Sequence, residues 1–104
     1  MELEQMQREA WENKVKKGFN ITNVEKEFCL LTSEVGEAYM AYLRDKDGLG
    51  EELADIAIYL LGLSQMLGYS LKDEIEKKIE INKNRKYKLN KYGVLIKDET
   101  DKKD

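Results

Sequence analysis

The run LADIAIYLLGL, residues 53–63, decides the fold of this chain of 104 residues. Wound as a helix, it is apolar around nearly its whole circumference, and Asp55 is its only carboxylate. A helix that is apolar on all sides has to be covered on most of them. Because one short chain offers too little surface for this, we expect the helix at the centre of a helical dimer or tetramer.

Two helices are predicted before this central one. Apolar residues at helical spacing predict a first helix over residues 1–17, which Gly18 ends. They are Leu3, Met6, Ala10 and Trp11. Thr22 and Glu25 have the form of a capping box and predict a second helix over about residues 23–44.

The central helix itself is predicted over residues 49–67, with Gly68 as its C-terminal glycine. Ser70 is predicted to start a fourth helix that continues to about Lys88. The helical pattern ends after residue 91. Residues 93–96 are predicted either to form a short strand or to pack on the helices.

Composition favours the same fold class. The chain has no proline, seven glycines and 38% charged residues, which suits long helices better than a sandwich or barrel with many turns. The predicted fold is therefore all-α, with four-helix-bundle-like helices that associate. We expect one helical domain over residues 1–91 and a charged, flexible tail over residues 92–104.

Charge and hydropathy exclude several classes of partner. The net charge is −3, whereas a protein that binds nucleic acid polymers is usually basic. Residues 1–10 are polar and predict no secretory signal, and residues 53–63 are too few to span a bilayer. We therefore expect a cytoplasmic protein with no membrane partner. A single cysteine excludes an internal disulfide.

Four carboxylates stand out from the 21 acidic residues. They form two pairs at i, i+3 spacing, one on the second predicted helix and one on the third, so each pair shares a helix face. They are Glu34 with Glu37 and Glu52 with Asp55. Unlike the other pairs at this spacing, they have apolar neighbours. Two helices joined by a tight turn lie antiparallel, so the pairs are expected to meet, and their repulsion favours protonation or bound cations.

The ligand type predicts the metal. Carboxylate oxygens suit hard cations, so we expect Mg²⁺, with Mn²⁺ as the alternative. The chain has no histidine, which argues against a di-iron or zinc site and removes the commonest general base. Mg²⁺ held by a few carboxylates binds phosphate oxygens and water, which points to phosphoryl chemistry. A carboxylate that is not fully used as a metal ligand is expected to take the proton of the attacking water. The sequence does not decide which of the four does so, and Glu37 is our candidate for the catalytic base.

Cations and aromatic residues elsewhere are candidate substrate contacts. Lys78, Asn82 and Arg85 share one face of the fourth predicted helix, where they either bind phosphate or form an ordinary solvated helix end. Tyr59 lies four residues after Asp55 and is either a core residue or a phosphate contact. A second group of candidates lies in and just after the first predicted helix. Its aromatic residues either stack on a base or pack in the core, and its lysine is a candidate substrate contact. It consists of Trp11, Lys14 and Phe19.

The motifs SEVGEA (33–38) and EELADIAIYL (51–60) together resemble the MazG-like family of all-α nucleoside triphosphate pyrophosphohydrolases. The family pattern is Glu-x-x-Glu, a spacer and Glu-x-x-Asp. Further similarity lies in ENKVKKGFN (12–20) and KIEINKNRKY (78–87). The resemblance therefore covers most of the chain, roughly residues 3–90.

The resemblance implies a specific reaction. Family members bind Mg²⁺ through the four acids, attack the α phosphorus of a nucleotide with water and release pyrophosphate. They assemble as dimers or dimers of dimers. By position, four residues are similar to the family's phosphate contacts: Tyr59, Lys78, Asn82 and Arg85. Relatives selective for deoxycytidine nucleotides place a histidine before the second helix, and this chain has none.

Two other interpretations stay open at this point. The chain is alternatively a non-catalytic helical module that serves as a scaffold, with its acids solvated. It is otherwise a degenerate family member that binds nucleotide or metal without turnover. Neither the base and sugar specificity nor the number of metal ions follows from the sequence.

Overall fold

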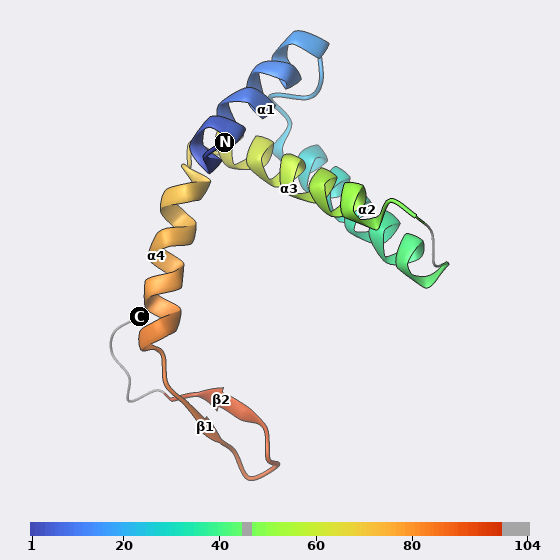
Figure 1. Cartoon of the computed structure of the whole chain (residues 1–104). Coiled ribbons are helices and arrows are strands. Elements are labelled where there is room, and N and C mark those ends of the chain that lie inside the picture. Colours follow the sequence, from blue (N-terminus) through green and yellow to red (C-terminus); the bar gives the residue numbers. More distant parts are fainter. Residues whose placement is uncertain (45–46, 99–104) are drawn as a thin grey trace. The chain divides into compact units, whose positions relative to one another are not determined.

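The computed structural model describes residues 1–44 and 47–98, which form four α-helices and one β-hairpin (Figure 1). The helices are α1 (Leu3–Lys17), α2 (Val24–Leu43), α3 (Leu49–Met66) and α4 (Leu71–Asn84), and the hairpin strands are β1 (Tyr87–Leu89) and β2 (Leu95–Lys97). The predicted all-α fold is confirmed. The hairpin is the only sheet within the described part of the chain.

The chain divides into two compact units, residues 1–71 and residues 72–104. The first unit contains α1, α2 and α3. The described part of the second unit contains α4 from its second residue onward and the hairpin.

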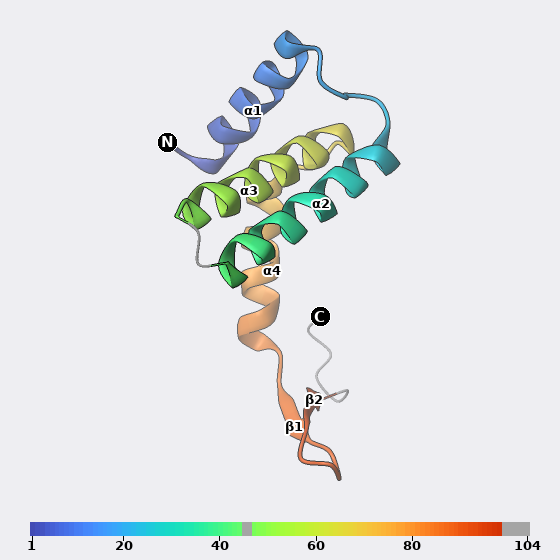
Figure 2. The same ribbon diagram turned by 90° about the vertical axis from the view of Figure 1, so that its right-hand side faces the viewer.

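In the first unit, α2 and α3 lie side by side as an antiparallel pair, and α1 packs on α3 (Figures 1 and 2). Among the described residues, the buried apolar side chains are Ala38 on α2 and Leu61 and Leu63 on α3. An antiparallel pair places the middle of α2 opposite the first half of α3. This arrangement brings residues 34–37 toward residues 52–55.

The helix ends follow the local sequence. Gly18 and Gly68 have φ of 74° and 81°, the left-handed conformation that ends a helix at little cost when the residue is glycine. The N-terminal end of α2 corrects one prediction. Asn23 is the N-cap, because its side chain accepts a hydrogen bond from Lys26 N, so the capping residue is one position later than Thr22.

The buried face of α1 also differs from the prediction. Met6 is 40% exposed, whereas Gln7 is buried. The Gln7 amide donates to Gln65 Oε1 and to the backbone oxygen of Tyr69, and its oxygen accepts from the backbone N–H of Leu71. A polar residue occupies this face because it pairs with two backbone groups that follow α3, the C=O of Tyr69 and the N–H of Leu71.

The fourth helix is shorter than predicted and ends at Asn84 instead of about Lys88. Residues 87–89 instead form β1, which pairs antiparallel with β2. In the turn between the strands, Asn90 Oδ1 accepts hydrogen bonds from the backbone of Tyr92 and Val94. Of the two alternatives predicted for residues 93–96, the structure has the strand, which covers residues 95–97. Residues 99–104 of the predicted tail lie outside the described residues.

Within residues 1–44 and 47–98, no helix is both long enough and apolar enough to span a membrane.

Candidate metal centre

Three carboxylates converge between α2 and α3. Glu34, Glu37 and Glu52 each offer a carboxylate oxygen, and these oxygens all lie within 4.8 Å of one another. The i, i+3 spacing puts the first two on one face of α2, and the antiparallel pairing with α3 brings the third opposite them. The predicted meeting of the two acidic pairs is therefore present for these three side chains, which we call the acidic cluster.

Asp55 lies beside the acidic cluster without belonging to it. Its side chain is exposed although its sequence neighbours are apolar. Its charge nevertheless acts on Glu34, which places it on the same side of the helix pair. Glu34 and Glu52 are half-buried, whereas Glu37 is exposed. Water and ligands therefore have access to the site from the Glu37 and Asp55 sides.

Desolvation, together with the neighbouring negative charges, raises the proton affinities of Glu34 and Tyr59. The pKa of Glu34 is raised above its usual value, first by desolvation and then by the charges of Glu37 and Asp55, with a hydrogen bond to Glu37 and the charge of Glu52 adding to it. The pKa of Tyr59 is raised as well, mainly by desolvation and then by the charge of Glu34. The site therefore favours either a proton or a cation.

The donor set fits a hard divalent cation. Oxygen ligands of one Mg²⁺ lie about 2.1 Å from it, so any two of them are at most about 4.2 Å apart. The 4.8 Å limit on the carboxylate oxygens requires only small rotations of the side chains to reach this spacing. All donors are oxygens, and the chain has no histidine. This chemistry suits Mg²⁺ or Mn²⁺ and does not suit zinc.

A cavity of about 680 Å³ adjoins the acidic cluster on the side of α1. Glu34 and Asp55 line it, and Tyr59 and Phe19 add aromatic surface. We call it the Phe19 cavity. Phe19 is 57% exposed although it is a large apolar side chain. The volume falls in the range of small-molecule sites.

A buried ion pair forms part of the wall of the Phe19 cavity. Lys14 Nζ lies 2.5 Å from Glu27 Oε2, and Glu27 is fully buried. The Asn20 amide donates to Glu27 Oε1 at 3.1 Å, so both carboxylate oxygens have a partner. The pair lies against Gly62 on α3, where a β-carbon would come within 3.4 Å of the Lys14 side chain, a van der Waals contact.

The ion pair was not predicted. Lys14 was expected to bind substrate, but in the structure its ammonium group is held by Glu27 and lies 6.0 Å from the centre of the Tyr59 ring. The available signal was weak. Lys14 lies seven residues after Gln7 on the buried face of α1, and Gly62 interrupts an otherwise bulky apolar helix.

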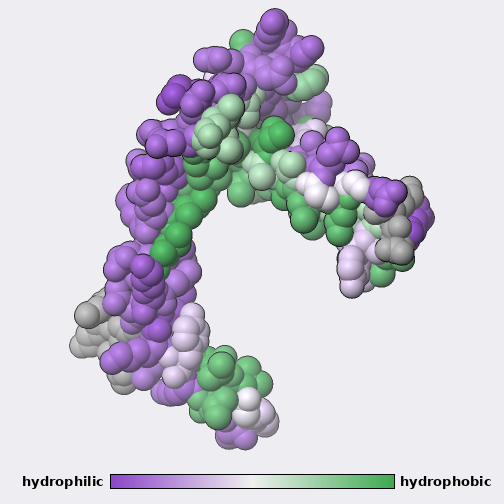
Figure 3. Space-filling view, viewed as in Figure 1, coloured by the Kyte–Doolittle hydropathy of each residue, from purple (hydrophilic) through white to green (hydrophobic). Residues whose placement is uncertain are grey.

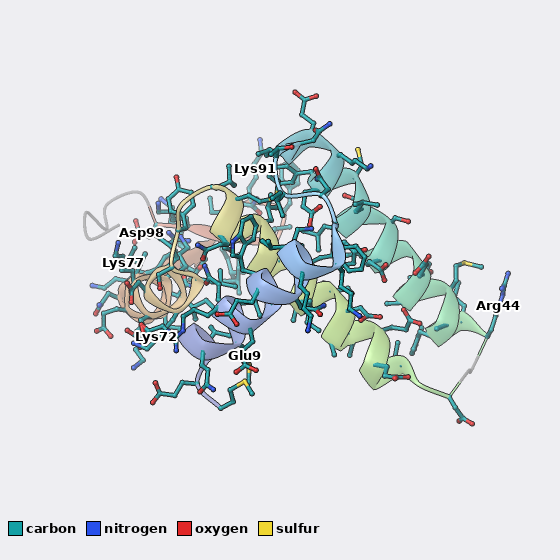
Figure 4. All side chains as sticks on the ribbon, turned by 90° about the horizontal axis from the view of Figure 1, so that it is seen from above. Glu9, Arg44, Lys72, Lys77, Lys91 and Asp98 are labelled. Carbon is teal, nitrogen blue, oxygen red and sulfur yellow. The ribbon has the colours of Figure 1, made fainter. Side chains whose placement is uncertain are left out.

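A second, shallower cavity of about 670 Å³ lies on the other side of the acidic cluster. Glu37 and Glu52 line it, and Arg44 lies at its far end. Arg44 extends from the C-terminal end of α2 (Figure 4). We call this cavity the Arg44 groove; sequence analysis did not single out its arginine. It is lined by Ser33, Gly36, Glu37, Met40, Ala41, Arg44 and Glu52.

The other predicted substrate contacts have different positions. Trp11 is half-buried on α1 and is not among the residues that line the Phe19 cavity, whereas Tyr59 is. Three further residues lie in the second unit, and their role in binding phosphate stays a prediction. They are Lys78 and Asn82 on α4 and Arg85 just after it.

Comparison with known proteins supports the motif analysis. A model of the MazG-like family matches residues 17–102, a range that contains the acidic cluster and Asp55. Trp11 and Lys14 lie outside the matched range. No curated protein and no solved structure matches the chain. Because the family model covers most of the sequence and includes both acidic motifs, the chain belongs to the MazG-like family.

Proposed function

We propose that this protein is a Mg²⁺-dependent pyrophosphohydrolase that converts nucleoside triphosphates, ribo- or deoxyribo-, to the monophosphate and pyrophosphate. Membership of the MazG-like family suggests nucleotide pyrophosphohydrolase chemistry. The observation that carries the proposal is the acidic cluster, whose three carboxylates converge beside a cavity of about 680 Å³. A site with phosphate-binding metal chemistry at one end and aromatic surface at the other matches a nucleotide.

The acidic cluster, with Asp55, would hold the metal. Bound Mg²⁺ would neutralise charge on the phosphate oxygens and lower the pKa of a water molecule. Without a cation, the charges of Glu37, Asp55 and Glu52 all raise the pKa of Glu34. A divalent ion would relieve this repulsion, and this supports the proposal that the site binds one. Mn²⁺ has the same ligand preference and is the expected substitute.

The protein's own residues have distinct roles in this proposal. Glu37 is the exposed member of the acidic cluster and is proposed to accept the proton of the attacking water. The Tyr59 hydroxyl, like any tyrosine hydroxyl with an ordinary or raised pKa, is protonated at neutral pH and available to donate to a phosphate oxygen. Phe19 offers an exposed ring in its cavity, on which a base can stack.

Further polar and basic residues are proposed as substrate contacts. Lys78, Asn82 and Arg85 are proposed to bind phosphate oxygens, as the family resemblance implies. Lys14 is proposed to act indirectly, because its ion pair with Glu27 shapes the wall of the Phe19 cavity. The proposed assembly is a homodimer or homotetramer, and the proposed location is the cytoplasm.

A substrate panel tests the reaction. We expect Mg²⁺-dependent release of pyrophosphate from at least one canonical or modified nucleoside triphosphate, and Glu37→Gln should lower kcat by about 10²-fold or more. Glu12→Gln, on an exposed face of α1, is the matched control and should leave kcat unchanged. Release of phosphate without pyrophosphate would show that a different bond is cut and would contradict the proposal.

Thermal melting tests the metal site separately. Mg²⁺ in the millimolar range should raise the melting temperature, and Asp55→Asn should abolish the rise, because a ligand that binds only the folded state stabilises it. If the acids are merely solvated and the protein is a scaffold, the melting temperature will not respond to Mg²⁺. A response without turnover of any triphosphate would identify a degenerate family member.

A further inference from the structure

The Arg44 groove lies across the acidic cluster from the Phe19 cavity. Glu34 and Asp55 line the Phe19 cavity, whereas Glu37 and Glu52 line the groove. Along α2, the cavity is lined by residues 26–34 and the groove by residues 33–44. A ligand that extends from one into the other must therefore pass the carboxylates.

The groove is lined partly by small side chains, and Arg44 is the one cation among its lining residues. Its lining includes three small residues, Ser33, Gly36 and Ala41, which leave room beside the helix. Glu37, Ala41 and Arg44 follow at i, i+4 and i+7, so they share one face of α2. At 1.5 Å per residue, Arg44 lies about 10 Å along the helix axis from Glu37.

Arg44 has no acidic partner in the described part of the chain. No hydrogen bond or ion pair of its side chain is present among residues 1–44 and 47–98, although Glu37 and Glu52 line the same groove. A guanidinium group presents a planar set of donors that matches phosphate oxygens in pairs. Its position at the end of a groove that starts at the acidic cluster suits a ligand with a charged tail.

We propose that the Arg44 groove binds the β and γ phosphates of the substrate, which leave as pyrophosphate, and that Arg44 contacts them directly. This inference rests on the proposed function. The base and sugar then occupy the Phe19 cavity, and the α phosphate lies at the acidic cluster. The substrate thus has one orientation along α2, with its nucleoside toward the start of the helix.

The reaction balances in this orientation. The water oxygen forms a bond to the α phosphorus, and its proton passes to Glu37. The bond between the α phosphorus and the bridging oxygen breaks, and its electron pair stays on that oxygen. The leaving pyrophosphate is then in the groove, where the Arg44 guanidinium stabilises its added negative charge. Arg44 therefore favours both substrate binding and departure of the leaving group.

Product binding provides the test, because the two products occupy different cavities. Melting temperatures of the full chain would be measured with inorganic pyrophosphate or with nucleoside monophosphates, with Mg²⁺ in excess over either ligand. In the wild type we expect both ligands to raise the melting temperature. Arg44→Ala and Arg44→Gln should lose most of the rise from pyrophosphate and keep the rise from a monophosphate.

Lys26→Ala is the matched control, because Lys26 is an exposed cation that lines the Phe19 cavity. It should keep the rise from pyrophosphate. In turnover assays, the inhibition constant of pyrophosphate should increase about tenfold or more in Arg44→Ala, as expected for loss of a charge-assisted contact. The inhibition constant of the monophosphate should stay within about twofold.

The inference is overturned if pyrophosphate does not raise the wild-type melting temperature, or if it raises that of Arg44→Ala equally. Both results can be interpreted because the Arg44 variants should fold: Arg44 is an exposed residue at a helix end, where its replacement has little effect on stability. The proposed function fails by a different result, the absence of turnover of every triphosphate by the wild type. The two failures are therefore distinguishable.

Discussion

Lys14 and Glu27 contribute to stability in a way that neither residue would alone. Their ion pair is almost completely buried, so loss of one partner leaves an uncompensated charge in the interior. We expect Lys14→Met to lower the free energy of unfolding by about 3–5 kcal/mol, measured by urea denaturation. Glu25→Ala, which removes an exposed carboxylate from the helix that carries Glu27, should change it by about 0.5 kcal/mol or less.

The double variant Lys14→Met/Glu27→Leu tests whether the two charges contribute to stability as a pair. Replacement of both charges removes the penalty for an unpaired buried ion, so this variant should be more stable than Lys14→Met alone. If the single and double variants have the same stability, the pair does not act as a unit.

Glu34 gives the metal-free protein a pH dependence of stability. Its folded pKa is raised, so between pH 4.5 and the folded pKa the native state binds more protons than the unfolded state. The contribution of Glu34 to stability therefore falls as the pH rises through this window. Relative to Glu34→Gln, the wild type in EDTA should lose stability from pH 4.5 to pH 7, as followed by urea midpoints.

Addition of Mg²⁺ at pH 7 should restore the stability of the wild type more than that of Glu34→Gln, because the cation replaces the proton in relieving repulsion. If the difference in stability between the wild type and Glu34→Gln is the same at every pH, the pKa of Glu34 is not raised in the folded state.

The acidic cluster could be predicted from the sequence, whereas the ion pair between Lys14 and Glu27 could not. Glu34, Glu37 and Glu52 could be identified because i, i+3 spacing and apolar neighbours are local properties of a helix. Lys14 and Glu27 occur among other charged residues, and nothing in their own helices marks them as buried. Their contact depends on the angle between α1 and α2, which no local pattern specifies.

At the scale of elements, glycines predicted the helix ends better than polar caps did. Gly18 and Gly68 end their helices where expected because few other residues tolerate a positive φ. Thr22, in contrast, competed with the adjacent Asn23 for the same role, and only the backbone geometry decides between them. The predicted end of α4 is wrong because residues 87–89 pair as β1 with β2, whereas helix propensity alone predicts that the helix continues to about Lys88.

The N-cap of α2 is directly testable, because both candidate residues can be removed. Asn23→Ala should lower the free energy of unfolding by about 1 kcal/mol, since it leaves the N–H of Lys26 without its partner. Thr22→Ala is the matched control and should change it by about 0.5 kcal/mol or less. Equal losses in urea denaturation would mean that the capping role is shared between the two residues.

Across the whole molecule, the largest unexplained feature is exposed apolar surface. On α2, Phe28, Val35, Tyr39 and Tyr42 are all about half exposed or more, and on α3 and its C-cap Leu53, Leu60 and Leu67 recur every seven residues. Figure 3 shows hydrophobic residues on the visible faces of these two helices. Soluble monomers rarely leave such stripes uncovered. Spacing of this kind is typical of helices that pack against another helix.

Self-association is therefore predicted, with the α3 stripe at the interface between copies. Leu60→Glu should place a charge in that interface and shift the protein toward monomers, because burial of an unpaired carboxylate is costly. Leu95 on β2 is more exposed than Leu60, so Leu95→Glu is the matched control and should leave the oligomeric state unchanged. Sedimentation velocity across a range of protein concentrations measures both. A wild type that sediments as a monomer at all concentrations would contradict the prediction, and the apolar stripes would then need a different partner.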